Sequence, residues 1–351
     1  MHKVGDTYMS IQTIMLKNFS VFEDLSVHLG KQINVFIGEN GTGKTQILKA
    51  IYATCKISHG NTLSEALTCF GIVNDTTSFV RHEGQESAEC IVELEGKITE
   101  HNFEEYEQSY VYDKRLNKKS KSIAYKFSKL PRFIPAIYIP VKDMLTHSKG
   151  LLAMSRKYKN FPFDATLLDI IDEASQWQLK ETPALAKSIL PILESMMKGK
   201  VVIKNEEFYI EKYDGRRVNF SLEAEGLKKI GLLWQLLMNE SITEGCIVLW
   251  DEPEANVNPK FIPVLVDCML ALSRHGVQIC LSTHSYILAK YIEIKMNEND
   301  AVQFHSLYQT GKGVQCESCH TFQDLRHNSI MKGFEALMED VYDKQIKQMG
   351  D

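Results

Sequence analysis

The fold of this chain is decided by the stretch Gly38-Glu39-Asn40-Gly41-Thr42-Gly43-Lys44-Thr45, which matches the phosphate-binding loop pattern G-x-x-x-x-G-K-[ST] at every fixed position. The apolar run at 33–37 before it predicts a buried strand, and the run at 46–53 after it predicts a helix. Strand, glycine-rich loop and helix in this order are the structural context that the motif requires. The sequence therefore predicts a site for the phosphates of a nucleotide.

The loop supplies the groups that phosphate recognition needs. Its glycines let backbone N–H groups wrap the phosphates, and the start of the helix adds the positive end of a dipole. We expect the residues from Gly38 to Gln46 to line the nucleotide, with Lys44 reaching the β- and γ-phosphates and the Thr45 hydroxyl holding Mg²⁺. ATP is favoured over GTP, because the sequence contains no N-K-x-D motif for guanine.

Composition places the chain among ordinary globular proteins. Its 351 residues allow one large domain or two modest ones, and a net charge of −5 gives no overall attraction to nucleic acid or membrane. No apolar segment approaches the roughly 18 residues of a membrane span, and the N-terminus has no apolar signal core. The eight cysteines are scattered. We therefore expect a cytoplasmic protein with reduced thiols and no membrane partner.

A second apolar strand is predicted at 246–250, and it ends in the acid pair Asp251-Glu252. Ligands of open parallel sheets bind at the carboxyl ends of the strands, so both acids are well placed for chemistry. We expect Asp251 to hold Mg²⁺ through water and Glu252 to act as the general base that polarises the attacking water. The same acid pair without a phosphate-binding loop would be weak evidence.

A third apolar strand is predicted at 277–283, directly before His284. One crossover helix, at 259–274, separates it from the acid pair, and this spacing is typical of adjacent parallel strands. A histidine at that strand end can donate a hydrogen bond to the γ-phosphate and so sense the bound nucleotide. We therefore count His284 with Glu252 and Lys44 as a candidate catalytic residue.

Together these motifs resemble the ABC-type ATPases of the RecF, SMC and OLD group, especially the stand-alone prokaryotic AAA-type ATP-binding branch. The resemblance covers roughly 9–56, 134–150 and 201–295, and it includes E-A-N-V-N-P-K at 254–260 and S-T-H-S at 282–285. It implies an α/β fold, namely an ABC-type P-loop NTPase head with a mixed central sheet, an antiparallel β insertion and a short helical arm.

The resemblance also implies a homodimer in which two heads sandwich two ATP molecules. Each site then takes a signature segment, usually L-S-x-G, from the opposite subunit. The best match has Ala224 in place of the serine, with Gly226 and Lys228 left to stabilise the phosphate charge. This departure affects the expected hydrolysis rate more than ATP binding. Ser221 is predicted to be the N-cap of the helix that follows.

Two further segments have roles implied by the resemblance. Asn256 and Asn258 belong to the loop that crosses the dimer interface in this group, and a plain strand-to-helix turn with Pro259 at the first helical position is compatible with that role. The segment around Lys142 and Asp143 stands where the glutamine loop of other ABC proteins would be. Either side chain reaches metal or phosphate, or both belong to a solvated loop.

The chain is expected to divide into an ATPase core, a β-rich insertion, a helical arm or lid, and a C-terminal part that completes the core. These parts are 1–56 with 134–150 and 201–295, then 57–133, 151–200 and 296–351. Strands in the insertion would form an antiparallel meander. Helices are predicted in the arm at 165–179 and 185–197, without the sustained heptads of a long coiled coil.

A basic run between Lys114 and Arg132 is interleaved with aromatic residues. Such a run can contact nucleic-acid phosphates while the aromatics stack on bases, but a solvated hairpin tip is the favoured interpretation.

The sequence predicts an ATP-binding and ATP-hydrolysing dimeric switch. Stand-alone members of the branch resemble ATPases of anti-phage defence systems such as Septu, retron and OLD-like systems, which implies a separate effector, for example a nuclease or a toxin. Two alternatives stay open: a RecF- or SMC-like DNA-repair ATPase stimulated by DNA, and a nucleotide-bound scaffold with negligible turnover.

Overall fold

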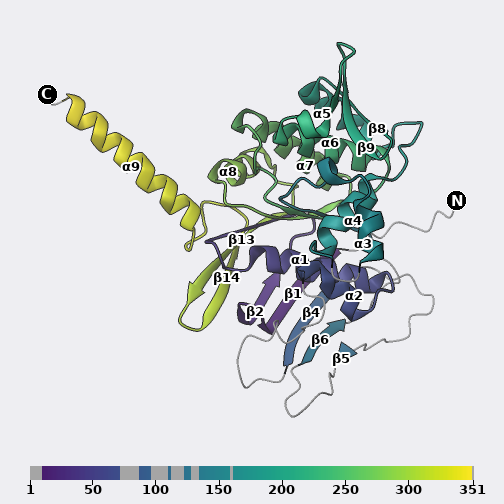
Figure 1. The fold of residues 1–351 in the computed structure, drawn as a ribbon. Coiled ribbons are helices and arrows are strands. Elements are labelled where there is room, and N and C mark those ends of the chain that lie inside the picture. Colours follow the sequence, from purple (N-terminus) through teal and green to yellow (C-terminus); the bar gives the residue numbers. More distant parts are fainter. Residues whose placement is uncertain are drawn as a thin grey trace.

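The central feature of the fold is a six-stranded sheet with the order β14-β13-β3-β12-β11-β7 (Figure 1). The structure, a computed structural model, describes residues 10–71, 87–95, 110–111, 122–127, 134–158 and 161–349. Neighbouring strands from β13 to β7 are parallel, and only the pair of β13 with β14 is antiparallel. The predicted mixed central sheet is therefore confirmed. Its strands are β3 (Ile33–Gly38), β7 (Ala136–Ile139), β11 (Ile247–Asp251), β12 (Gln278–Ser282), β13 (Val302–Thr310) and β14 (Gly313–Cys319).

A second sheet has the order β2-β1-β4-β6-β5. Its strands are β1 (Ser10–Phe19), β2 (Phe22–His28), β4 (Ser87–Glu95), β5 (Tyr110–Val111) and β6 (Ser122–Phe127). The pairing departs from a pure antiparallel meander, because β4 and β6 are parallel neighbours and β5 lies outside β6.

A small antiparallel sheet, β10-β9-β8, stands at the top of Figure 1 beside the helices that follow β7. It contains β8 (Gly199–Lys204), β9 (Glu207–Lys212) and β10 (Arg217–Asn219). The hairpin predicted at Asp214-Gly215 is present, and Gly215 has the positive φ of 85° that this turn needs.

Helices cover both faces of the central sheet. The helices of the described residues are α1 (Lys44–Ser58), α2 (Leu63–Leu67), α3 (Leu151–Lys157), α4 (Ala165–Ala174), α5 (Leu190–Met197), α6 (Glu225–Met238), α7 (Ile262–Arg274), α8 (Tyr286–Lys295) and α9 (Ser329–Met349). Of these, α1 lies on one face, and α6 and α7 lie on the other. The two helices expected in the arm are shorter than predicted, since α4 ends at Ala174 and a 3₁₀ turn at Leu185–Ser188 precedes α5. Pro191 explains the late start of α5, because proline suits only the first turn of a helix.

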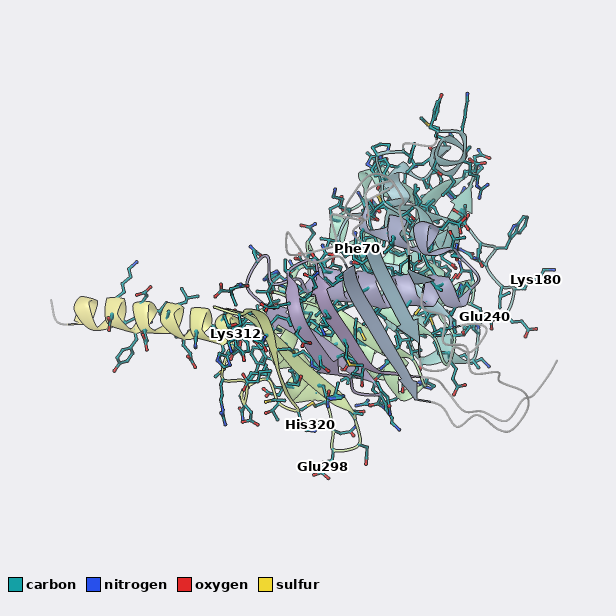
Figure 2. All side chains as sticks on the ribbon, turned by 90° about the horizontal axis from the view of Figure 1, so that it is seen from below. Phe70, Lys180, Glu240, Glu298, Lys312 and His320 are labelled. Carbon is teal, nitrogen blue, oxygen red and sulfur yellow. The ribbon has the colours of Figure 1, made fainter. Side chains whose placement is uncertain are left out.

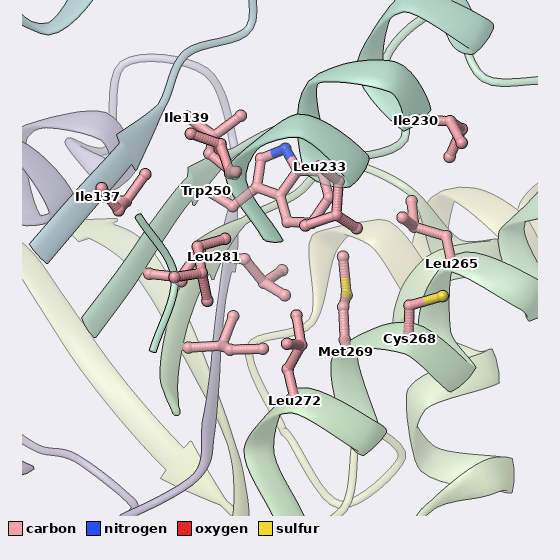
Figure 3. Close-up of a cluster of buried hydrophobic side chains, with 14 of the residues drawn as sticks. Ile137, Ile139, Ile230, Leu233, Trp250, Leu265, Cys268, Met269, Leu272 and Leu281 are labelled. Carbon is pink, nitrogen blue, oxygen red and sulfur yellow. The ribbon is translucent and has the colours of Figure 1, made fainter. Parts of the chain in front are cut away.

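Alternate residues of the central strands feed two separate cores. Val35 and Trp250 point toward α6 and α7, whereas Phe36 and Leu249 point toward α1 and the second sheet. Figure 3 shows Trp250 among apolar side chains of α6, α7 and neighbouring strands. Full burial of one Val, Leu or Phe side chain stabilises the folded state by on the order of 1.5–3 kcal/mol. Packing on both faces therefore holds the strand ends of β3, β11 and β12 in fixed relative positions.

Helix α9 extends away from the rest of the protein in two perpendicular views (Figure 1, Figure 2). Its first turns are anchored by Phe334, whose ring stacks on Tyr286 of α8 at a centroid distance of 4.0 Å. Within the described residues, none of the helices is both long and apolar enough to cross a membrane.

Candidate nucleotide-binding and hydrolysis site

The carboxyl ends of β3, β12 and β11 lie side by side in that order. Asp251 pairs in register with Ser282, and Ser282 pairs with Phe36. The phosphate-binding loop continues from β3, the acid pair from β11, and His284 follows β12. The structure thus brings together three motifs that lie far apart in the sequence, at the sheet edge where open α/β proteins bind ligands.

Lys44 is the first residue of α1, and its side chain folds back over the loop. Its Nζ donates to the carbonyl oxygens of Gly38 and Glu39, each at 2.9 Å. Burial lowers the pKa of Lys44 to about 8, while Glu252 and then Asp251 oppose that shift. A buried ammonium beside the free N–H groups of a helix start forms a strong anion-binding position.

Two glycines of the loop are fixed by close packing. A Cβ on Gly43 would lie 2.4 Å from the Phe22 ring, and one on Gly38 would lie 2.3 Å from the Leu307 carbonyl oxygen. Both also have φ in the left-handed half of the map, at 90° and 146°. The loop backbone is therefore held against β2 and β13 in a shape that only glycine permits.

The Asp251 carboxylate is buried and receives three hydroxyl groups. Thr45 Oγ1 donates to both of its oxygens at 3.0 Å, Tyr138 donates at 3.4 Å, and Ser282 Oγ also donates to it. A carboxylate and a hydroxyl are the hard oxygen donors that suit Mg²⁺, which keeps most of its water shell. The donor set fits Mg²⁺. The sequence predicts no role for Tyr138 or Ser282, although Ser282 opens the S-T-H-S motif and both residues lie at or near strand ends.

Glu252 has an unusual backbone conformation, with φ at 45° in the left-handed region. Its N–H donates to the Ser282 carbonyl oxygen at 3.0 Å, and its carboxylate lies 3.8 Å from His284 Nε2. Burial and then the nearby Lys44 charge lower the pKa of His284, so its ring is neutral at pH 7. An accessible carboxylate beside a neutral imidazole can accept a proton from water while the imidazole donates a hydrogen bond.

The signature segment, with Ala224, Gly226 and Lys228, lies at the start of α6. Ala224 is the N-cap of α6 and makes no side-chain cap bond, so the prediction that Ser221 caps this helix is wrong. The reason is a separate 3₁₀ turn at Phe220–Leu222, which Asn219 caps and which delays the start of α6. Lys228 is buried, and its Nζ lies 2.6 Å from Glu225 and 3.5 Å from Asp143.

Gly226 explains how the signature segment meets the loop after β11. A Cβ on Gly226 would lie 2.9 Å from the Asn256 carbonyl oxygen and 3.2 Å from Val257 Cα. Asn256 itself has φ of 64°, and Asn258 Oδ1 accepts a bond from Lys260 N at 3.0 Å. Asn258 therefore caps the 3₁₀ turn that begins at Pro259 and precedes α7, which agrees with the predicted strand-to-helix turn, and the interface role of Asn256 and Asn258 stays a prediction.

Asp143 turns toward α6. Its carboxylate accepts a hydrogen bond from Leu145 N at 3.0 Å, in addition to its contact with Lys228, and it bonds to the Thr146 hydroxyl as well. Lys142 is exposed. The proposed basic patch at Lys114–Arg132 lies outside the described residues except for the backbone of β6, so its predicted role stays a prediction.

Two family models match the chain. Residues 9–149 match the model described as "AAA ATPase domain", and residues 109–289 match the model described as "AAA domain, putative AbiEii toxin, Type IV TA system". The second match spans more than half of the chain.

The curated relatives that match include DNA replication and repair proteins named RecF. The protein from Listeria monocytogenes (strain EGD-e) is 25% identical over 157 residues, which are 43% of this chain and 37% of that protein. The protein from Lactococcus lactis is 38% identical over 63 residues, or 18% of each chain. These matches thus span well under two thirds of the relatives' own length.

Solved structures of SMC heads share the fold. The Pyrococcus furiosus SMC head with an extended coiled coil, bound to the C-terminal domain of ScpA, matches with a TM-score of 0.53 and 11% identity over 95% of this chain and 100% of that one. An SMC head bound to the C-winged helix domain of ScpA gives 0.54 and 11% over 89% and 98%. The predicted P-loop head fold, which SMC heads share, is therefore confirmed.

Proposed function

The chain belongs to the AAA family whose model matches residues 109–289, and we propose that it binds and hydrolyses ATP as a homodimeric switch for a separate effector in anti-phage defence. The observation that carries this proposal is the bond from Thr45 to Asp251, because it joins the phosphate loop to the acid pair. Lys44, Glu252 and His284 stand beside that bond, where the γ-phosphate would be expected.

The proposed chemistry is in-line attack of water on the γ-phosphorus, which breaks the bond to the bridging β–γ oxygen and releases ADP and phosphate. Glu252 accepts the proton of that water, and His284 donates a hydrogen bond to the phosphate oxygens. Lys44 and the N-terminus of α1 stabilise the charge that develops on the phosphoryl group. Thr45 and Asp251 would hold Mg²⁺, which neutralises phosphate charge when bound.

The signature half of the site supports dimerisation. Leu222 is 80% exposed and Glu225 is half exposed, although both flank Ala224 at the start of α6. In the group that the sequence resembles, this segment completes the opposite subunit's site. An exposed apolar side chain beside an uncapped helix start is consistent with a surface that a second subunit covers.

The effector role draws on the family description, which names a toxin of a Type IV TA system. That wording favours a switch associated with a toxic activity. The RecF matches favour the second candidate, a DNA-repair ATPase whose hydrolysis is stimulated by DNA. The two candidates share the same ATP chemistry and differ in what stimulates it.

The test compares wild type, Glu252→Gln and Lys44→Ala by light scattering after size-exclusion chromatography. We expect Glu252→Gln to double in mass in Mg·ATP, Lys44→Ala to stay monomeric, and wild type to return to monomer as ATP is consumed. A monomeric Glu252→Gln protein with ATP bound would refute the dimeric switch. Hydrolysis measured with and without DNA, and mass spectrometry of proteins that co-purify with Glu252→Gln, then separate the two roles.

A further inference from the structure

Two adjacent lysines at the start of α6 have different partners. Lys228 lies close to two carboxylates, those of Glu225 and Asp143. Lys229 is equally buried, with 7% of its surface exposed, yet no carboxylate of the described residues lies within 4.0 Å of its Nζ. Its ammonium instead donates to the backbone carbonyl oxygen of Glu252 at 2.8 Å. Burying a charged group costs free energy unless it is paired. The burial of the Lys229 ammonium against a backbone carbonyl therefore needs an explanation.

The acceptor is the peptide of the candidate general base. Glu252 holds a left-handed φ of 45°, a conformation that non-glycine residues keep only when their surroundings enforce it. Its N–H donates to the Ser282 carbonyl oxygen at 3.0 Å, and its C=O accepts two bonds, from the Ala255 N–H of the same turn at 3.0 Å and from the Lys229 ammonium at 2.8 Å. The bonds from Ser282 and Lys229 clamp the residue between β12 and α6, and Lys229 supplies the bond that comes from the signature helix.

The same helix connects Glu252 to the signature segment. Lys229 lies five residues after the N-cap Ala224, and Gly226 between them packs on the Asn256 backbone. A shift of the helix start would therefore move the Lys229 ammonium and the backbone of the loop after β11 together. Burial lowers the pKa of Lys229, and the carboxylates of Glu254, Glu252, Asp251 and Glu225 oppose that shift.

We infer that Lys229 is a positioning residue, which fixes the backbone of Glu252 so that its carboxylate is aimed at the attacking water and which couples that aim to the start of α6. The inference rests on the proposed function for its catalytic consequence. Its structural content, the clamp on the Glu252 peptide, is independent of turnover.

The test uses Lys229→Met, which keeps the length of the stem without the ammonium, and Lys229→Arg, which restores a cationic donor. The matched control is Lys56→Met, because Lys56 is a largely buried lysine of α1 paired with Asp169 at 2.6 Å, away from the acid pair. Hydrogen–deuterium exchange of the peptide 247–258 is measured without nucleotide. Steady-state hydrolysis then gives kcat and KM for each variant.

We expect faster exchange around Glu252 in Lys229→Met alone. We also expect kcat to fall about 10- to 100-fold with KM nearly unchanged, because a misplacement of about 1 Å in a catalytic group costs up to about 100-fold. Lys229→Arg should recover most of the lost kcat. A merely destabilising loss of a buried charge would affect Lys56→Met and Lys229→Met alike.

Unchanged kcat in Lys229→Met overturns the inference, whatever the exchange result. If wild type itself shows no hydrolysis, the proposed function fails, and exchange alone decides the clamp: faster exchange in Lys229→Met upholds it, and unchanged exchange overturns it.

Discussion

The candidate site has a phosphate-loop half, with Lys44, Thr45 and Asp251, and a signature half around Ala224. The two halves differ in how many of their groups already have partners within one chain. In the phosphate-loop half, Lys44, Thr45 and Asp251 already bond to groups of the same chain; Lys44 and Asp251 are buried and Thr45 is half-buried. In the signature half, Ala224 offers no side-chain cap and Leu222 is largely exposed. The side chains of the phosphate-loop half therefore find their partners when one chain folds, whereas the signature half stays exposed at the surface.

This difference follows from where each half gets its contacts. The phosphate loop is packed between two sheets, and its glycines touch Phe22 and the Leu307 backbone. The signature segment packs on its own chain through Gly226, Leu227 and the buried lysines of α6, while Leu222 stays exposed. Substitutions in the first half should therefore act on nucleotide binding in a single chain, and those in the second half should act on stability and on dimer-dependent turnover.

Lys44→Ala is expected to have the largest effect. The change removes the ammonium expected to reach the phosphates and leaves two loop carbonyls without their donor, so ATP affinity should fall by about 100-fold or more, which is about 2.7 kcal/mol. Calorimetric titration with Mg·ATP measures it. Lys49→Ala, one turn further along α1 and paired with Asp164, is the control and should bind within about twofold of wild type. Equal affinities for the two variants would contradict the assignment of the phosphate loop.

Gly226→Ala tests the internal contact of the signature half. The new Cβ would meet the backbone of Asn256 and Val257, which cannot move like a flexible side chain, so we expect a loss of about 1–3 kcal/mol in the free energy of unfolding. Urea denaturation measures the loss, and ATP affinity should be unchanged. Gly333→Ala in α9, where a Cβ meets nothing within 4 Å, should be neutral or slightly stabilising. Similar behaviour of both variants would show that Gly226 is not tightly packed.

Acidification should lower the free energy of unfolding through the packing of β13 on β3, the strand that leads into the phosphate loop. His305 of β13 is fully buried, bonds to Ser318 and Asn34, and stacks on Phe36, and burial lowers its pKa to about 3. The unfolded chain protonates this histidine near pH 6.5 while the folded one does not. The free energy of unfolding should therefore fall as pH drops from about 6.5 toward 3, by about 1.4 kcal/mol per pH unit from this residue.

His305→Gln supplies the measurement for that dependence. The amide can still bond but does not titrate, so the loss of unfolding free energy between pH 6.5 and 5 should shrink by about 2 kcal/mol in urea denaturation. An unchanged pH dependence would mean that His305 is not held neutral by burial.

The same contrast governs what the sequence could predict. The phosphate loop and the strands ending at Asp251 and before His284 were predictable, because adjacent residues and apolar runs fix them locally. The adjacency of β11 and β12 was also predictable, because the crossover between them has the ordinary length for neighbouring parallel strands. The roles assigned to Lys44, Glu252 and His284 are still predictions, although the structure places these residues together.

Contacts between distant segments were beyond sequence reasoning. Lys228 meets Asp143, and Gly226 meets Asn256, only because α6 packs beside β7 and β11, and no local pattern records that packing. The predicted cap at Ser221 was wrong because Phe220 is drawn into the core, which makes a separate turn more favourable than an earlier helix start. The burial of Phe220, and not the capping propensity of Ser221, therefore determines where α6 begins.

Ala224→Ser has the smallest expected effect, and it separates the two halves most directly. A serine at the N-cap can accept a bond from the free N–H groups of the first turn, which should raise the free energy of unfolding by about 1 kcal/mol. Urea denaturation measures it, with Ala336→Ser on the exposed face of α9 as a control that should be slightly destabilising. The serine is also the residue that the signature pattern expects, so hydrolysis should rise when the dimer forms. A gain in stability with no gain in turnover at any protein concentration would mean that the start of α6 is only a helix end, and that the open half of the site takes no part in the reaction.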